Sequence, residues 1–429
     1  MPKRFRGWLA LLLTPLALGA QERPLVFRGA TLYPIAGPPI ADGVLVVHRG
    51  KIVAVGGPST PIPAGATVVD VRGKTILPGL VDTHSHIGGA EGGDRSGPLQ
   101  PGVRVLDALN PFDDSFGRAR AGGITTVNVM PGSGHLSSGQ TVYLKLRRAR
   151  TIQQMLICQD PLREICGGLK MANGTNPRGE PPFPGTRAKA AALVRERFLA
   201  AQAYRERRRR DPTTPRDLDL DALVEVLEGR RIVHHHTHRA DDILTVLRLA
   251  QEFGFKVVLH HVSEAWKVAD EIARAGAPAS IIVLDSPGGK LEAAEIRLEN
   301  GAALERAGAL VAYHTDDLIT DSRFFLRAAA LGVRAGMSRT KALEALTLAG
   351  ARMLGLEHRI GSLEVGKDAD FLVLSGDPLA TTTRVEQTWI EGQKVFDWAD
   401  PRDRLLATGG FGAYRPGQAH VTEEDEDGN

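Results

Sequence analysis

The chain has 429 residues, of which 42% are apolar and 24% are charged, enough for one large domain and a smaller one. These fractions are ordinary for a soluble globular protein. The formal charge is +3, which equals the contribution of Lys3, Arg4 and Arg6 near the N-terminus. Because the remainder is balanced, we do not expect nucleic acid or an anionic membrane as a partner.

The N-terminus has the pattern of a secretory signal. The basic residues precede an apolar run at 8–18 and the small residues Gly19 and Ala20. The run is short for a membrane span, although a signal anchor that stays attached remains an alternative. No cysteine lies near this region, which argues against a lipoprotein. We expect residues 1–20 to be removed, leaving a periplasmic or secreted protein without stable membrane insertion.

The chain has two cysteines, Cys158 and Cys166, too few for a disulfide framework. In an oxidising compartment they could pair. Their spacing does not decide between a disulfide and two half-buried thiols, so both alternatives stay open.

The two ends of the chain share a β-rich character. Residues 24–74 alternate short β-rich runs with Gly and Pro turns, and residues 366–395 repeat this pattern. This arrangement predicts a small β domain built from both ends of the chain.

The middle alternates apolar runs with helix-like segments, the pattern of a parallel sheet with crossover helices. Eight runs are candidate strands: 76–86, 123–130, 141–146, 168–171, 231–238, 256–262, 279–285 and 309–316. Amphipathic stretches between them include 241–253, 265–275, 323–335 and 340–354. Eight such units predict an α/β fold with a (β/α)₈ TIM-like barrel, whose active site lies at the C-terminal ends of the strands.

Two insertions interrupt this pattern. Residues 88–102 are Gly-rich and predict a mobile loop, while 175–186 form a Pro/Gly-rich loop before a long helix at 187–210. The arginines that end this helix are expected to be solvated and to interact with the helix dipole. The acidic end of the chain lacks apolar residues and is expected to be disordered.

Histidines gather at the ends of the predicted strands. The chain has 13 histidines, and nine of them lie toward the C-terminal ends of these runs: His84, His86, His234, His235, His236, His238, His260, His261 and His314. His84 and His86 lie two residues apart, so on a strand their imidazoles point to the same face. Lys170 lies in the fourth run, and Asp316 is the last residue of the eighth. Nitrogen and carboxylate ligands that converge on one barrel mouth suit Zn²⁺ or a similar divalent ion.

The chain resembles the amidohydrolase superfamily, and within it the imidazolonepropionase-like and prolidase-like members. The motifs that carry the resemblance are P-G-L-V-D-T-H-S-H (78–86), the strand-end histidines His236 and His261, H-T-D (314–316) and G-S-L-E-V-G-K-D-A-D-F (361–371). The resemblance implies a metal-dependent hydrolase barrel with a composite β-sandwich domain. The expected boundaries are 76–357 for the barrel, 21–75 plus 358–405 for the sandwich, and 406–429 for a tail.

The resemblance also implies the ligands. They are His84, His86, His236, His261 and Asp316. His236 is preferred over His234 and His238, and His261 over His260, although the neighbouring histidines stay open as alternatives. His238 would then lie in the surroundings of the metal or face the substrate.

Lys170 decides the expected number of metals. In binuclear relatives a lysine of the fourth strand is carboxylated by CO₂, and the carbamate bridges two ions. This chemistry requires a neutral amine, which burial and nearby cations favour by lowering a lysine pKa. The alternative is a lysine paired with a carboxylate beside a single ion. We favour a carboxylated Lys170.

The resulting hypothesis is an exported metal-dependent hydrolase that cleaves C–N bonds in small molecules such as dipeptides, N-acyl amino acids or cyclic amides. Asp316 would be the general base and then the general acid. His238 or His135 would stabilise the developing oxyanion. The alternatives are an ester, lactone or phosphotriester hydrolase and a catalytically inactive binding barrel. The substrate and the oligomeric state cannot be inferred from the sequence.

Overall fold

The computed structural model describes residues 23–90, 92–283, 290–317 and 319–409. The predicted signal segment and most of the predicted tail therefore lie outside the described residues. Within the described ranges, no helix is both long and apolar enough to cross a bilayer.

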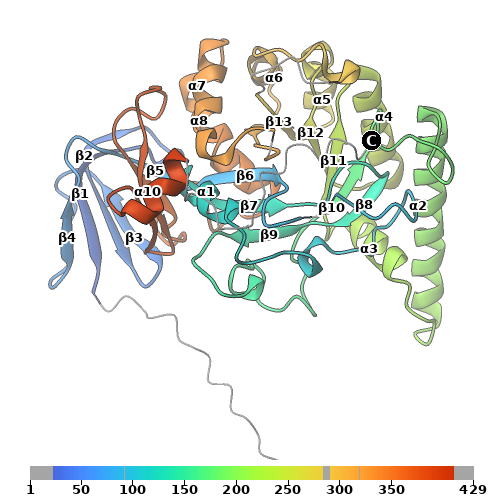
Figure 1. Cartoon of the computed structure of the whole chain (residues 1–429), viewed down its shortest axis with the longest axis horizontal. Coiled ribbons are helices and arrows are strands. Elements are labelled where there is room, and N and C mark those ends of the chain that lie inside the picture. The colour runs from blue at the N-terminus through green and yellow to red at the C-terminus, as the bar shows by residue number, and fades with distance from the viewer. Residues whose placement is uncertain (1–22, 91, 284–289, 318, 410–429) are drawn as a thin grey trace, which may run out of the picture.

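An eight-stranded sheet combines strands from the two ends of the chain (Figure 1). Its N-terminal strands are β1 Leu25–Leu32, β2 Ile40–His48, β3 Lys51–Gly56, β4 Thr67–Asp70 and β5 Thr75–Pro78, and its C-terminal strands are β15 Phe371–Leu374, β16 Val385–Ile390 and β17 Gln393–Asp397. The two groups meet where β5 pairs antiparallel with β15. A two-layered sandwich and the domain boundaries stay predictions.

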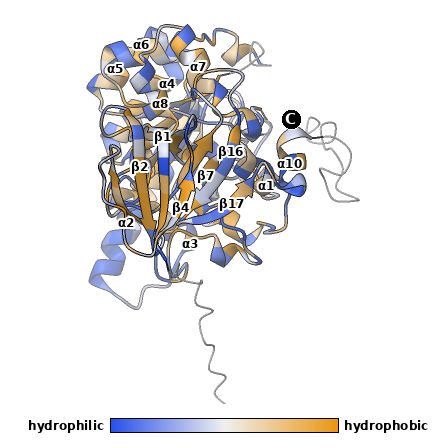
Figure 2. Ribbon diagram, turned by 90° about the vertical axis from the view of Figure 1, so that its left-hand side faces the viewer, coloured by the Kyte–Doolittle hydropathy of each residue, from blue (hydrophilic) through white to orange (hydrophobic). Residues whose placement is uncertain are grey.

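Aromatic packing holds this sheet together. The rings of Phe27 and Phe371 lie 4.9 Å apart in an edge-to-face arrangement, and Trp389 stacks on Phe371 at 5.6 Å. All three rings are buried, and β1 and β2 are predominantly apolar in Figure 2. Because Phe27 comes from one end of the chain and the other two rings from the opposite end, the cluster joins both ends.

The described part of the middle of the chain contains nine strands on two further sheets, ordered β14-β13-β12-β11-β10-β8 and β6-β7-β9. The strands are β6 Leu80–Ser85, β7 Ile124–Val129, β8 Ser137–Gln140, β9 Val142–Lys145, β10 Leu169–Ala172, β11 Val233–Thr237, β12 Val257–His261, β13 Ala279–Ile281 and β14 Val311–Tyr313. Each of the eight predicted runs contains a strand. The first and last strands approach each other where the Asp316 amide donates to the His84 carbonyl at 2.9 Å. Closure into one barrel stays a prediction.

Ten α-helices accompany the strands in the described ranges, and those from α4 to α8 lie along one side of the middle sheets (Figure 1). They are α1 Ser115–Ala121, α2 Arg187–Arg210, α3 Leu218–Leu227, α4 Ala240–Phe253, α5 Ala269–Arg274, α6 Asn300–Ala307, α7 Arg327–Arg334, α8 Arg339–Ala345, α9 Leu348–Met353 and α10 Pro401–Thr408. Helix α2 has its predicted bounds, and its start at Arg187 is explained by the Thr186 side chain, which caps the first turn. The stretch predicted at 340–354 is two helices, α8 and α9.

The third predicted run departs from the expected parallel pattern. β9 pairs antiparallel with β7, and β8 pairs antiparallel with β10. The physical reason is the connection: twelve residues separate β7 from β9, and no α-helix of the described residues lies among them to carry the chain back across the sheet, so β9 returns antiparallel to β7. β8 runs in the same direction as β9, because only Thr141 separates the two strands. The first run is also divided, because β5 belongs to the eight-stranded sheet and only β6 to the middle. Gly79 separates them, and a Cβ there would lie 2.2 Å from Thr125 Oγ1.

A buried charge cluster joins the middle of the chain to the eight-stranded sheet. Lys145, at the end of β9, is 1% exposed, and its Nζ lies 2.5 Å from Asp368, 3.0 Å from Asp370 and 3.1 Å from Glu391. Asp368 and Asp370 are the two aspartates of the G-K-D-A-D-F segment, so this part of the motif holds two regions of the chain together.

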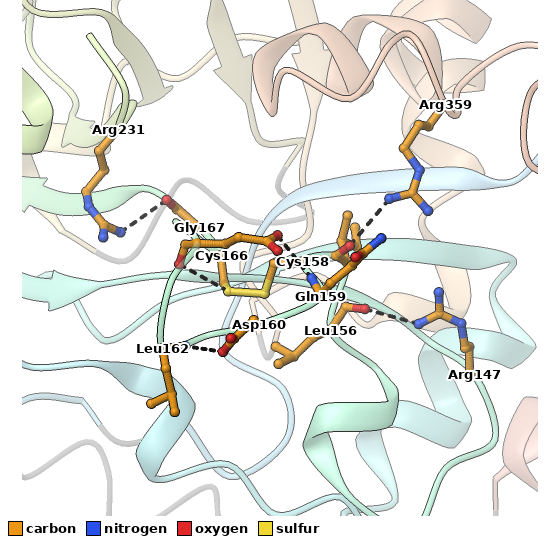
Figure 3. The surroundings of a disulfide bond; sticks show 12 residues. Arg147, Leu156, Cys158, Gln159, Asp160, Leu162, Cys166, Gly167, Arg231 and Arg359 are labelled. Carbon is orange, nitrogen blue, oxygen red and sulfur yellow. Dashed lines mark hydrogen bonds between the residues drawn. A yellow bond between two sulfur atoms is a disulfide. The ribbon is translucent and has the colours of Figure 1, made fainter. Parts of the chain in front are cut away.

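The two cysteines form a disulfide, which resolves the alternative left open by the sequence (Figure 3). The bond closes the segment between β9 and β10. Arginine side chains hold both ends of this segment: Arg231 donates to the Gly167 carbonyl at 3.2 Å, and Arg147 donates to the Leu156 carbonyl at 3.2 Å.

Candidate metal centre

The pairing of parallel strands aligns the strand-end histidines. β10, β11 and β12 pair in parallel, so that Ala172 lies opposite His236 and His236 opposite His260. β14 follows β13 in the same sheet, and its C-terminal end is continued by His314 and Asp316. The histidines predicted to share one mouth therefore emerge at the same edge of the sheet.

A turn in the backbone explains why both His260 and His261 reach this mouth. Neighbouring residues on a regular strand point to opposite faces, yet both rings contact His84, at 5.0 and 4.7 Å between centroids. His261 has a φ of +68° and Val262 a φ of +39°. Asp316 also lies in this left-handed region, with a φ of +50°. Such conformations are uncommon for residues other than glycine and concentrate at functional sites.

The first group of metal-ligand type comprises His84, His86 and Asp316. Asp316 Oδ1 lies 3.0 Å from His86 Nε2 and 3.3 Å from His84 Nε2. His86 Nδ1 lies 2.8 Å from the Met130 carbonyl, to which it donates. This bond leaves Nε2 with the lone pair, as expected for a ligand whose orientation is fixed by its other nitrogen.

The second group comprises His236, His238 and His261, each offering a nitrogen within 4.8 Å of the others. A third combination joins His84, His261 and His314. Asp316 Oδ2 lies 3.8 Å from His261 Nδ1, so this carboxylate stands between the first two groups.

Lys170, on β10, is fully buried beside the first group. Its Nζ lies 3.2 Å from His84 Nε2 and 3.1 Å from Met130 Sδ. No ion pair within the described ranges involves Lys170, but the charge of Asp316 acts on it, and the alternative of a lysine paired with a carboxylate beside a single ion stays a prediction. Burial lowers the pKa of Lys170 to about 7, and the cation of Lys290 acts in the same direction.

The protonation states suit metal ligation. Burial lowers the pKa of His84, His236 and His261 well below the usual value, so these imidazoles are neutral and have lone pairs to donate. Burial alone would raise the pKa of Asp316, but its close contact with His86 and the positive charges around it outweigh burial and bring the pKa to about 2. Asp316 is therefore ionised.

A chain of buried rings below the centre was not anticipated from the sequence. Tyr143 Oη lies 2.9 Å from His234 Nε2, His234 Nδ1 lies 2.9 Å from His260 Nε2, and His260 Nδ1 lies 3.3 Å from His84 Nδ1. If His84 binds a metal through Nε2, its Nδ1 donates to His260, and the direction of each following bond is set. His234 and His260 thus orient a predicted ligand. The sequence gives one signal for each residue: His234 lies two residues before His236, and His260 lies one residue before His261.

Lys290 and Glu292 also reach the centre without having been predicted. Lys290 Nζ lies 3.5 Å from His236 Nε2, 2.7 Å from Asn176 Oδ1 and 3.2 Å from Glu292. Glu292 accepts bonds from the amide and the hydroxyl of Thr175, both at 2.7 Å. The loop at 175–186 therefore borders the mouth, and Lys290 could have been suspected from its position after the seventh strand.

No contact among the described residues joins His135 to the predicted metal ligands. Its Nε2 lies 2.7 Å from the Asp94 carbonyl, and its ring contacts Phe183 at 5.3 Å. Its predicted role stays a prediction. His238, by contrast, stacks on His261 at 5.0 Å and lies in the second group.

The donor set fits a divalent cation. Within the described residues, one buried ring nitrogen each of His236, His238 and His261 has no hydrogen-bond partner. Leaving such atoms unpaired is costly, and a metal ion would satisfy them. Neutral imidazoles with one ionised carboxylate are ligands that zinc and similar ions prefer.

Comparisons with known proteins agree with this chemistry. The sequence profile of the amidohydrolase family matches residues 168–396. Amidohydrolase tasK of Hapsidospora irregularis is 28% identical over 392 residues, which cover 83% of this chain but only 40% of that protein. An imidazolonepropionase of Sphingopyxis alaskensis is 28% identical over 386 residues, covering 81% of this chain and 90% of the relative.

Solved structures extend the likeness. An amidohydrolase from Thermotoga maritima MSB8 is 36% identical, with a TM-score of 0.81, and the alignment covers 87% of this chain and all of that one. A prolidase crystallised with N-methylphosphonate-L-proline is 20% identical with a TM-score of 0.55, over 87% of this chain and 99% of the other, and this likeness shows the fold alone. With the profile match over more than half of its length, the chain belongs to the amidohydrolase family and is a metal-dependent hydrolase that acts on carbon–nitrogen bonds.

Proposed function

We propose that the chain is an exported zinc hydrolase that cleaves amide bonds in small molecules such as dipeptides, N-acyl amino acids or cyclic amides. The position of Asp316 carries this proposal. Its carboxylate lies within 3.3 Å of His84 and His86 and 3.8 Å from His261, between the two groups of ligands.

In this proposal His84, His86 and Asp316 would hold a first ion, while His236 and His261 would hold a second. Lys170, carboxylated on Nζ, would offer a ligand to both ions in the proposed (β/α)₈ barrel. A divalent ion here supplies Lewis acidity, which lowers the pKa of water and polarises a scissile carbonyl. The low pKa of Lys170 supports the carboxylation, because only a neutral amine adds to CO₂.

The chain's own groups move the proton. Asp316, ionised at neutral pH, takes the proton of the attacking water and delivers it to the leaving nitrogen, so that the C–N bond breaks as the amine departs. The developing oxyanion needs a cation or a donor. The sequence pointed to His238 or His135 for this role. We add Lys290, because its ammonium group lies 3.5 Å from His236 and belongs to the same mouth.

Export is supported by two features. The basic and apolar pattern of residues 1–20 is typical of a signal peptide. The disulfide between Cys158 and Cys166 is of a kind that persists in oxidising compartments. Fractionation of the native host, probed with an antibody, tests this part: signal in the cytoplasm alone would contradict it.

A substrate screen tests the catalytic part. The metal-stripped and zinc-loaded full chain would be assayed with dipeptides, N-acyl amino acids, lactams and matched esters. We expect zinc-dependent turnover of at least one amide class. Turnover of esters alone would favour the ester-hydrolase alternative, and no turnover of any class would favour a binding protein.

A further inference from the structure

The imidazoles of His236, His238 and His261 form a compact trio at the ends of β11 and β12. Their ring centroids lie 4.4 Å apart for His236 and His261, 4.7 Å for His236 and His238, and 5.0 Å for His238 and His261. All three side chains are buried. The resemblance to the family uses only His236 and His261 as ligands and leaves His238 without an assigned contact to a metal.

His238 has the environment of a ligand. Its Nδ1 lies 2.7 Å from Ser263 Oγ, and within the described ranges its buried Nε2 has no hydrogen-bond partner. If Nδ1 donates its hydrogen to the serine, Nε2 carries a lone pair that nothing satisfies. Metal-binding histidines typically bond through one nitrogen and donate from the other in this way.

A purely structural role explains the trio poorly. Packed imidazoles in a core normally pair both nitrogens, as His234 does here with Tyr143 Oη and His260 Nε2. Among the residues that the structure describes, each member of the trio instead has one buried nitrogen without a hydrogen-bond partner. Burial disfavours protonation of the trio, and Lys290, whose Nζ lies 3.5 Å from His236 Nε2, acts in the same direction by lowering the pKa of His236 and His238.

We propose that His238 is a metal ligand, so that the second ion is held by three imidazoles, His236, His238 and His261, with Ser263 as the positioning residue of His238. This assignment rests on the metal centre of the proposed function and adds a donor to it. A three-histidine site has enough donors to bind an ion without the Lys170 carbamate, and it leaves a further coordination position open.

Metal titration tests this assignment without relying on activity. The metal-stripped full chain would be titrated with Co²⁺, following the visible absorption spectrum, and the bound metal counted by elemental analysis after dialysis. We expect the wild type to retain two ions. His238→Ala should weaken the second ion by more than about 100-fold and alter its spectrum, because losing a ligand exceeds the effect of losing its hydrogen-bond partner. Ser263→Ala should weaken the same ion by about 10- to 100-fold.

Two further variants make the result decisive. His135→Ala removes a histidine outside the trio and should leave both ions and the spectrum unchanged. His238→Asn retains a group that can bond Ser263 but offers no imidazole, so it should reproduce the loss seen with alanine; circular dichroism verifies the fold of both His238 variants. Unchanged affinity and an unchanged spectrum in folded His238→Asn would overturn the assignment.

The outcome is separable from the proposed activity. A chain that binds its second ion through His238 but hydrolyses no amide would contradict the proposed function and uphold the ligand. If the wild type hydrolyses amides while His238→Asn keeps the metal content and spectrum of the wild type, the proposed function would be upheld and the assignment of His238 as a ligand would be contradicted.

Discussion

Two buried lysines on strands that are consecutive in the sequence, Lys145 on β9 and Lys170 on β10, should respond in opposite ways when each is replaced by methionine. In the metal-free chain, burial lowers the pKa of Lys170 from 10.5 to about 7. At about 1.4 kcal/mol per pKa unit, the folded state carries a penalty of about 5 kcal/mol when this lysine is charged. Lys170→Met removes the charge and keeps most of the apolar volume, so it should stabilise the metal-free chain below pH 7.

The direction in which the stability of the wild type changes with pH follows from the protonation of Lys170 in the folded and unfolded chains. Between pH 7 and 10.5 the unfolded chain keeps the Lys170 proton while the folded chain loses it, so the stability of the wild type rises with pH by up to about 1.4 kcal/mol per unit. Lys170→Met lacks this contribution, and its advantage should shrink as pH rises. The buried histidines act in a separate window: their lowered pKa values cost stability only below pH 6.5.

Lys145→Met is the matched control. Burial opposes the charge of Lys145, but Asp370, Glu391 and Asp368 outweigh it and raise its pKa. Removing this cation leaves the buried Asp370 without an ion pair among the described residues, although Asp368 keeps Lys51 and Arg359 and Glu391 keeps Arg147, and it should cost about 3–5 kcal/mol. Urea unfolding with a chelator, at pH 6.5, 7.5, 8.5 and 9.5, measures both effects. Parallel pH profiles for the wild type and Lys170→Met would refute the reasoning, and with it the neutral amine that carboxylation needs.

Three further outcomes follow from the centre. Asp316→Asn should lower kcat by about 10²–10⁴-fold, because it removes the proton acceptor; a kcat near that of the wild type at equal metal content would contradict this role. Lys290→Met should lower kcat by about 10²–10³-fold with little change in metal content, whereas a change in metal content alone would assign Lys290 to ligand positioning. Tyr143→Phe removes the hydroxyl that ends the chain of rings through His234 and should weaken metal binding by about 10-fold; unchanged affinity in a competition assay with a chelating dye would show that the chain does not orient His84.

The predicted ligands could be recognised because chemistry and position coincide in the sequence. His84 and His86 end an apolar run, His236 and His261 end later runs, and Asp316 ends the eighth. Strand periodicity then places each group at one edge of a parallel sheet. The structure brings these five residues together with Lys170.

Other features escaped the sequence because they depend on distances through space. The direction of β8 and β9 follows from a connection after β7 that contains no crossover helix within the described residues, which runs of apolar residues do not reveal. Lys290 reaches His236 across 54 positions of sequence. The chain of rings from Tyr143 to His84 joins four separate strands, so no local sequence pattern predicts it.

The sequence by itself determined which residue types stand at the strand ends, and therefore the kind of chemistry, since ligand identity is local and strand periodicity orients it. Only the tertiary structure showed how His260 and His261, neighbours in the sequence, both reach His84. This depends on a left-handed turn at His261, with a φ of +68°, which regular strand geometry does not contain. The tertiary structure also decided that Cys158 and Cys166 pair and that, within the described residues, one buried nitrogen of His238 has no hydrogen-bond partner, because both outcomes depend on what the folded chain places beside each atom.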